Sequence, residues 1–309
     1  LVLQTGGKSR STFSMALKEI VIPEVDLSVQ EKVIKEIKKI EDKIKSLKKE
    51  LVPLQDVVEE VFIKYGVKGT KFEKKEFEAF TTDASKIAAQ KFLRCGAQYR
   101  AFCDVHNGLL FEDKTEFPIV KLGSVMKLYK AKTLKKGILD KEYILLDLED
   151  LEALTGKISN EEKLVTEIGS DKVVFNDADL IVTKIDPYLG YTFVNSKSKP
   201  FIGTTELLPF VITEEKTIPE YIKYLLLSTE YIFKSGLLMY GKRHPRIHPL
   251  DLLNIKVPLP DLDIQREIIS EIQKQEEING DANQKINELR DEINNILFEA
   301  LTERTGKKT

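Results

Sequence analysis

Cysteine, histidine and long apolar runs are all scarce in this chain of 309 residues, and each scarcity excludes a class of protein. The two cysteines, Cys95 and Cys103, are too few for a disulfide framework, so we expect two reduced thiols in a cytoplasmic protein. No apolar run approaches the roughly 20 residues of a membrane-spanning helix, and no signal peptide is visible. The net charge of −2 excludes a uniformly basic protein but leaves room for a local basic face.

The three histidines, His106, His244 and His248, do not form a metal-binding pattern. His244 and His248 are four residues apart, but Pro245 and Pro249 argue against the helical spacing that would bring their rings together. No cysteine or carboxylate cluster at ligand spacing accompanies them. We therefore expect no metal and no cofactor.

Catalytic patterns are equally scarce. Asp186-Pro187-Tyr188 is similar to the Asp-Pro-Pro-Tyr turn that holds a target amine in amino-methyltransferases, but it lacks the second proline, and no glycine-rich loop for a methyl donor precedes it. This tripeptide is therefore predicted to form a turn. Because no Ser/His/Asp or nuclease carboxylate pattern is present either, we expect a protein without an active site.

An internal repeat dominates the chain. The stretch from Gly241 to Ile269 contains a basic Gly/Pro loop, an apolar strand that ends at Pro258, and the start of a long helix. Subtracting 235 from each number aligns it, without a gap, with the stretch that begins at Gly6 and reaches Pro23 and Ile34. Repeats of this length indicate a duplicated structural unit.

A heptad pattern follows each copy of the repeat, with mostly apolar residues spaced four and three apart and Lys or Glu filling most of the positions between them. In the second copy, two of the spaced positions are polar, Gln275 and Asn279. This pattern predicts a coiled coil in which each long helix packs against the other. Pro53 should kink or break the first helix near residue 50. The predicted seam includes Ile37, Ile44, Leu51, Val58, Ile272, Ile286, Leu289 and Ile293.

The remaining sequence predicts an α+β protein with five parts. Residues 1–25 are the tail of a domain, 26–64 the first coiled-coil helix, 65–116 a helical linker, 117–260 a mixed α/β domain, and 261–305 the second coiled-coil helix. Within the mixed domain, short alternating apolar runs bounded by turn residues predict strands. One helix is expected from Pro219 to Ser235.

The loop after Gly241 is the candidate binding surface. Four cations or potential cations fall within six residues, stiffened by Pro245, and the earlier copy also carries charge, at Lys8 and Arg10. A solvated surface turn would show the same composition. Arginine beside glycine nevertheless suits contact with guanine edges or phosphates, which favours DNA binding. The predicted DNA-binding residues are Lys242, Arg243, His244 and Arg246, joined on the same face by Lys184, Tyr188, Tyr191, Thr204 and Thr205.

These features together resemble the specificity (S) subunit of type I restriction–modification systems. The resemblance covers about residues 1–64 and 117–305 and is strongest in the repeat. It also includes Leu122-Gly123 and the run from Asp177 to Lys184. The matching residues of the second copy are Leu252, Ile255, Val257–Pro260, Asp261, Gln265 and Ile268–Ile269, and those of the first copy are Leu17, Ile20, Ile22, Pro23, Asp26, Gln30, Val33 and Ile34.

The resemblance implies target-recognition domains that each read half of a split DNA site and are separated by two antiparallel helices. Residues 117–260 would be one such domain, and residues 1–25 the remnant of another. Such a subunit is not catalytic; it brings methyltransferase (M) subunits, and through them a restriction (R) subunit, to double-stranded DNA. Two alternatives remain open: a coiled-coil module that binds protein, or the recognition tail of a fused methyltransferase–nuclease.

Overall fold

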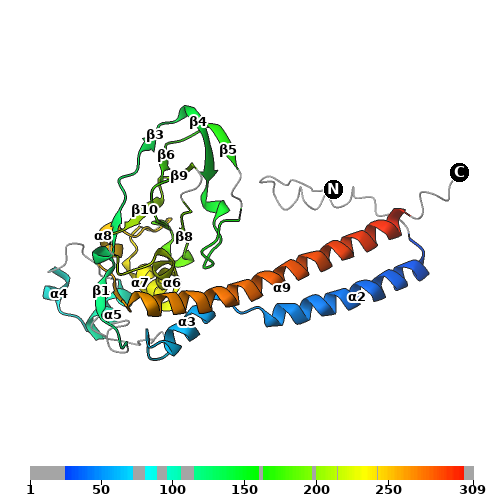
Figure 1. Ribbon diagram of the computed structural model, residues 1–309, viewed down its shortest axis with the longest axis horizontal. Helices are drawn as coiled ribbons and strands as arrows, with labels where there is room; N and C mark the ends of the chain where they lie inside the picture. The colour runs from blue at the N-terminus through cyan, green and yellow to red at the C-terminus, as the bar shows by residue number, and fades with distance from the viewer. Residues whose placement is uncertain are drawn as a thin grey trace. The chain divides into compact units, whose positions relative to one another are not determined.

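The computed structural model divides the chain into two compact units. Within the described residues, unit 1 comprises 25–51 and 278–302, and unit 2 lies between them, from Val52 to Glu277. The long helix α9 (Leu262–Thr302) contributes to both units (Figure 1). The residues that the structure describes are 25–71, 81–88, 96–105, 115–159, 163–196, 200–213, 215–241 and 243–302.

Unit 2 contains a four-stranded antiparallel sheet in the order β2-β10-β7-β8. Strand β7 is buried along its whole length, in keeping with its run of β-branched and apolar side chains. A two-stranded sheet joins β1 to β11 and so brings residues far apart in sequence together. The strands are β1 (Ile119–Lys121), β2 (Met126–Leu128), β7 (Leu180–Thr183), β8 (Thr192–Val194), β10 (Leu207–Ile212) and β11 (Lys256–Pro258).

A five-stranded sheet in the order β3-β6-β9-β4-β5 forms the second layer of unit 2. Only the β4–β9 pair is parallel. Strand β4 follows β3 after a short connection, and β6 follows β5 in the same way. Because β3 pairs with β6 and the start of β4 pairs with the end of β5, the four strands form one bent ribbon (Figure 1). The strands are β3 (Thr133–Leu134), β4 (Gly137–Leu146), β5 (Leu164–Ile168), β6 (Lys172–Val174) and β9 (Phe201–Thr204).

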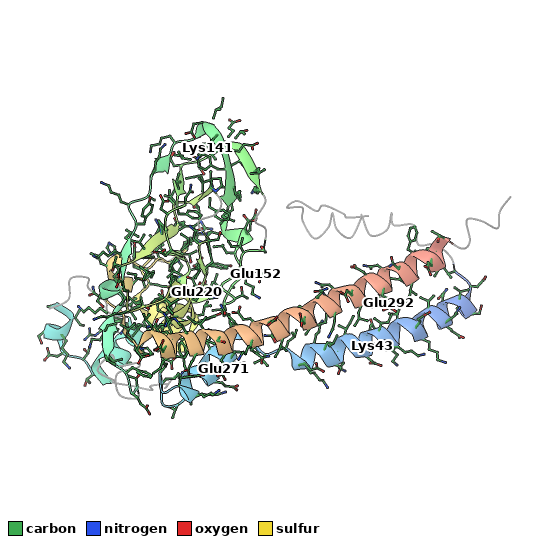
Figure 2. All side chains as sticks on the ribbon, viewed as in Figure 1. Lys43, Lys141, Glu152, Glu220, Glu271 and Glu292 are labelled. Atoms are coloured by element: carbon green, nitrogen blue, oxygen red, sulfur yellow. The ribbon has the colours of Figure 1, made fainter. Side chains whose placement is uncertain are left out.

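Helices complete unit 2. Three of them, α3, α6 and α7, together with the first part of α9, supply most of the residues of its largest apolar core. Phe62 of α3 and Tyr221 of α6 are fully buried there, with ring centroids 6.1 Å apart. Lys64 Nζ, at the end of α3, donates to both carboxylate oxygens of Glu271 on α9, at 2.7 and 2.6 Å; Glu271 is labelled in Figure 2. The helices are α3 (Leu54–Lys64), α4 (Ala84–Ala88), α5 (Ala97–Val105), α6 (Pro219–Leu227), α7 (Thr229–Leu238) and α8 (Pro249–Leu253), and the short 3-10 helices are η1 (Leu122–Ser124), η2 (Leu148–Asp150) and η3 (Pro187–Leu189).

Gln265 fastens the start of α9 to unit 2. Its side chain is fully buried, and its oxygen Oε1 accepts hydrogen bonds from Thr217 Oγ1 (3.2 Å) and the Ile218 backbone N–H (3.0 Å). Its nitrogen Nε2 donates to the carbonyls of Lys216 (2.7 Å) and Pro260 (2.8 Å). All four hydrogen-bonding positions of the amide are therefore used, as a buried amide requires.

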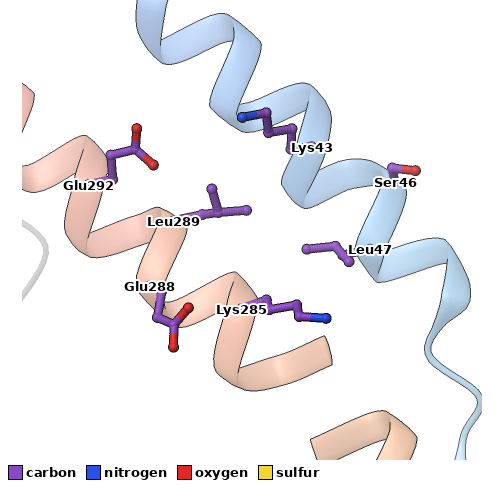
Figure 3. Close-up of a pocket in the computed structure, with 7 residues that line it drawn as sticks. All are labelled: Lys43, Ser46, Leu47, Lys285, Glu288, Leu289 and Glu292. Carbon is purple, nitrogen blue, oxygen red and sulfur yellow. The ribbon is translucent and has the colours of Figure 1, made fainter. Parts of the chain in front are cut away.

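Unit 1 is a pair of long helices, α2 (Leu27–Glu50) and the second part of α9, that run antiparallel (Figure 1). Ile40, Ile44 and Ile286 form its buried centre. A gap of about 500 Å³ lies beside this centre, where Leu47 and Leu289 point toward each other between charged side chains (Figure 3). The partly buried seam residues are Leu47, Leu51, Leu289, Ile293 and Ile296.

The predicted seam is shorter than expected at one end. Val58 and Ile272 are fully buried in the main core of unit 2 and do not belong to the apolar cluster of unit 1. Pro53 explains this difference, because α2 ends at Glu50 and α3 begins just after the proline. The heptad phase continues across the break, but the residues beyond it serve a different core. Ile37 remains in α2 and is half-buried.

One helix was also expected where the structure has two. Ser228, which ends α6, has φ −65° and ψ 151°, and its hydroxyl accepts a hydrogen bond from the Tyr231 backbone N–H (3.4 Å) as the N-cap of α7. The α+β class, the long second helix and the antiparallel helix pair agree with the sequence prediction. Residues 1–24 and 303–305 of the predicted parts lie outside the described residues.

Candidate nucleic-acid interface

Strand β7 ends in a tight turn, Asp186–Gly190, which contains η3. Asp186 (φ 44°, ψ 52°) and Gly190 (φ 58°) both adopt the left-handed conformation. The Leu189 N–H donates to the Asp186 carbonyl at 2.9 Å and closes the turn. Gly190 is required for a second reason, because a Cβ atom there would lie 2.7 Å from the side chain of Leu154. The turn predicted from the Asp-Pro pair is thus present.

Backbone strain is concentrated at this turn. Among the described residues, the non-glycine positions with positive φ are Leu154 (58°), Asp186 (44°) and His244 (53°). Asp186 belongs to the turn, and Leu154 donates its N–H to the Leu189 carbonyl at 3.1 Å. Such conformations cost on the order of 1–3 kcal/mol each and cluster where a binding surface must be held in one shape. The third strained residue, His244, belongs to a neighbouring hairpin.

That hairpin spans residues 240–246. Tyr240 and Arg246 exchange two backbone hydrogen bonds, each 2.9 Å long, and so close the loop between them. Gly241 has a φ of 96°, a backbone conformation that residues with a side chain rarely adopt. Arg243 and His244 lie at the tip of the hairpin and are exposed. The basic loop predicted from the sequence is therefore a hairpin closed at its base by Arg246, with Arg243 and His244 at its tip.

Backbone hydrogen bonds dock the hairpin against the Asp186 turn. The Asp186 N–H donates to the Pro245 carbonyl, and the Ile247 N–H donates to the Lys184 carbonyl, both at 2.8 Å. Lys184 in turn donates its N–H to the Glu206 carbonyl at 2.9 Å. Three separate segments thus meet: the end of β7 with its turn, the β9–β10 turn (residues 204–206), and the hairpin. We call this group of segments the turn cluster.

Glu206 is the charged centre of the turn cluster. Its carboxylate accepts hydrogen bonds from Arg246 Nε (3.0 Å) and Nη2 (2.8 Å), and Lys184 Nζ lies 3.8 Å away. The hydrogen bonds from Arg246 lower the pKa of the Glu206 carboxyl, and the charge of Lys184 acts in the same direction, whereas partial burial opposes them. Arg246 also donates from Nη1 to the His244 carbonyl at 2.8 Å. Arg246 therefore clamps the hairpin to the β9–β10 turn.

The outer side chains of the turn cluster have a different character. Tyr188 is 44% exposed, and its hydroxyl lies 3.5 Å from Asp186 Oδ1. His244 Nδ1 lies 3.9 Å from the other carboxylate oxygen of Asp186. Arg243 has no ion-pair partner among the described side chains. Arginine and tyrosine side chains are among the donors that contact phosphates and base edges in protein–DNA complexes, and both types are exposed here on a hydrogen-bonded base.

Comparison with known proteins identifies the family. The model of the type I restriction modification DNA specificity domain matches residues 107–291 of the chain. The chain belongs to this family.

A search of solved structures matches the chain to type I subunits at low identity. The S subunit from M. genitalium is 11% identical to this chain, with a TM-score of 0.44. The match covers 89% of this chain and 61% of that subunit. The HsdS subunit from Thermoanaerobacter tengcongensis has 13% identity and a TM-score of 0.39, with 58% of its length and 89% of this chain covered. This chain therefore spans about 60% of the length of these proteins. No curated protein matches the chain.

The structure brings together most of the predicted binding residues of the specificity domain. Lys184, Tyr188, His244 and Arg246 lie within the turn cluster, as the contacts above show. Thr204 accepts a hydrogen bond from the Glu206 N–H (3.4 Å), and Thr205 is exposed beside it. Lys242 lies outside the described residues.

Tyr191 has a different environment. It is half-buried and packs against the apolar cluster around Phe175 and Phe193. His248 caps helix α8, because its Nδ1 accepts a hydrogen bond from the Leu250 N–H at 3.2 Å. His106 and Cys95 lie outside the described residues, and Cys103 is a free thiol. Within the described ranges, no helix is both long and apolar enough to cross a membrane.

Sequence reasoning missed two features of the specificity domain. Glu206 was not selected, because a single acidic residue after two threonines has no pattern that connects it to an arginine forty residues later. The second feature did have a signal: residues 126–139 contain five lysines and no acidic residue. A local count of charge, in place of the chain total, would have found it.

Proposed function

We propose that this chain recognises part of a split double-stranded DNA target and directs methyltransferase subunits to it, without an active site of its own. In this proposal the mixed α/β domain reads the DNA and the paired helices set the distance to the other half of the target. A restriction subunit would join through the methyltransferase subunits. Such partners imply a cytoplasmic protein.

The family match is the observation that carries the proposal. Its span of residues 107–291 includes all three segments of the turn cluster, in which exposed cationic and aromatic side chains stand on a strained, hydrogen-bonded base. Arg246 is held internally by Glu206, so its role would be to position the hairpin. Arg243, at the tip, is then the side chain best placed for a bidentate contact with guanine.

The helix pair supports the second half of the proposal. Antiparallel helices that share a buried apolar centre form a long spacer, and one heptad of about 10 Å corresponds to roughly three base pairs of duplex DNA. Several large apolar side chains of unit 1, including Ile34 at 62% and Phe298 at 67%, are exposed. Exposed apolar residues on a long helix are suited to contact with partner subunits.

Selection from a pool of random duplex DNA tests the recognition of sequence. The purified chain should enrich one short motif. Arg243→Ala should weaken binding to that motif by roughly 1–3 kcal/mol and relax the preference at one position. Arg290→Ala is the matched control, because Arg290 is an exposed arginine on α9 in unit 1. A pool that stays random after selection would contradict the proposal.

A methylation assay tests the absence of catalysis. The chain, a type I methyltransferase subunit and labelled methyl donor are combined with DNA that carries the selected motif. Methyl transfer to this DNA should require both proteins. Transfer by the chain alone would show that it has an active site and would refute the proposed role.

A further inference from the structure

One edge of unit 2 is unusually basic. Residues 126–139 contain five lysines and no aspartate or glutamate, and all five side chains are exposed. We call these residues the lysine edge: Lys127, Lys130, Lys132, Lys135 and Lys136.

The lysine edge follows the outer strands of two sheets. Strand β2 is one of the two outer strands of the four-stranded sheet, and β3 is one of the two outer strands of the five-stranded sheet. The connection between them is held by backbone hydrogen bonds, from Tyr129 N to the Pro209 carbonyl (2.8 Å) and from Val174 N to the Lys132 carbonyl (2.9 Å). In Figure 1 the chain from β2 to β3 runs along one side of unit 2. The lysines are therefore carried by ordered backbone.

Most of these charges are not neutralised within the described part of the chain. Lys135 Nζ forms an ion pair with Asp171 at 2.7 Å. The other four lysines have no ion pair among the described residues. The turn cluster differs, because Arg246 and Lys184 both face Glu206 there. Two carboxylates also contact this segment, because Asp171 accepts from the Lys136 N–H and Asp177 from the Tyr129 hydroxyl, but five lysines outnumber them. The excess of positive charge favours a polyanion.

The length of the lysine edge fits a duplex. From Lys127 to Lys136 the chain advances nine residues, at most about 30 Å in an extended conformation. One turn of B-DNA is about 34 Å long. The edge is also close to the turn cluster: Leu134 pairs with Lys172, and Lys172 pairs with Thr204. Two strand spacings, about 10 Å, therefore separate β3 from the β9–β10 turn, compared with a major groove about 12 Å wide.

From this arrangement we propose that the lysine edge binds DNA phosphates and positions the duplex, while the turn cluster contacts base edges. The proposal rests on the proposed DNA-recognition function. Phosphate contacts fix register without reading sequence, so the two surfaces have separable effects. A competing role is protection of exposed strand edges against pairing with other chains, for which lysine is also suited.

Salt dependence separates the two roles. Each phosphate contact contributes about −0.9 to the slope of log K against log salt concentration. We therefore compare the wild type with the quadruple variant Lys127→Gln/Lys130→Gln/Lys132→Gln/Lys136→Gln. The magnitude of its slope should be smaller by about 3.6, and its affinity should be lower by roughly tenfold or more for every duplex tested. Each single substitution should remove about 0.9 from the slope. The quadruple Lys→Arg variant should keep it.

The matched control removes four exposed lysines from α2 of unit 1: Lys38→Gln/Lys39→Gln/Lys45→Gln/Lys49→Gln. It changes the net charge equally and should leave the slope within about 1 of the wild type. A lysine-edge variant that aggregates while its soluble fraction retains the wild-type slope would overturn the proposal and support edge protection. Wild-type chain that binds no duplex at any salt concentration would instead refute the DNA-recognition function itself.

Discussion

Replacement of Gln265 should destabilise unit 2 more than any surface change on α9. Gln265→Ala deletes four hydrogen bonds at a fully buried position and leaves the Ile218 N–H and the Lys216 and Pro260 carbonyls without their partner. A net contribution of about 1 kcal/mol per bond gives a loss of about 4 kcal/mol. The result would be a helix whose first turn is no longer fastened to the chain around residues 215–218.

Urea unfolding followed by tyrosine fluorescence and circular dichroism measures this loss. Gln273→Ala is the matched control, because Gln273 is exposed two turns further along the same helix, and its loss should be below about 0.5 kcal/mol. Gln265→Glu should be at least as harmful as Gln265→Ala at pH 7, because a carboxylate would replace the Nε2 donor opposite two carbonyl oxygens. Protonation of this carboxyl at low pH should restore part of the stability. A loss below about 1 kcal/mol for Gln265→Ala would refute the reasoning.

Two further predictions concern the turn cluster and unit 1. Glu206→Gln should release Arg246 and broaden the sequence preference of the chain, measured by selection from random duplexes; an unchanged motif would exclude the clamp. The pKa of Glu206 is lower in the folded than in the unfolded state, so its carboxylate stabilises the fold above the unfolded pKa of about 4.3. This contribution is lost as the pH falls through the lower folded pKa. The unfolding free energies of the variant and the wild type should therefore converge in acid. In unit 1, Ile286→Ala should cost about 2–4 kcal/mol, because Ile286 is 3% exposed, whereas Ile278→Ala, at 57% exposure, should cost less than about 0.5 kcal/mol. Helicity at 222 nm during thermal unfolding measures both, and equal losses would contradict the assigned seam.

Local patterns predicted the regular parts of the fold well. Heptad spacing placed the second long helix at 261–305, and the structure has α9 from Leu262 to Thr302. The break at Ser228 was missed, because a serine inside an apolar helical run carries no local signal until its hydroxyl caps the next helix. Val58 was assigned to the wrong core for a related reason, since periodicity shows which face is apolar but not what packs against it.

The candidate binding surface was only partly predictable for the same physical reason. Composition identified the basic loop, and the structure adds the connection from Arg246 to Glu206, which depends on the pairing of β7 with β10 and on the docked hairpin. Tyr191 looked equivalent to Tyr188 in the sequence, but it packs against apolar residues while Tyr188 is exposed. Long-range contacts decide such cases, and a single sequence does not contain them.

The hairpin tip has a consequence for how such a protein can change its target. Arg243 contributes no side chain to the apolar clusters of the described structure and has no positive φ, unlike its neighbours Gly241 and His244. Substitution of Arg243 therefore leaves the folding free energy of unit 2 almost unaltered, while the base of the loop stays fixed by Glu206 and the backbone of Lys184. In the proposed function, a point mutation at Arg243 can thus change the recognised sequence without compensating changes in the rest of the domain.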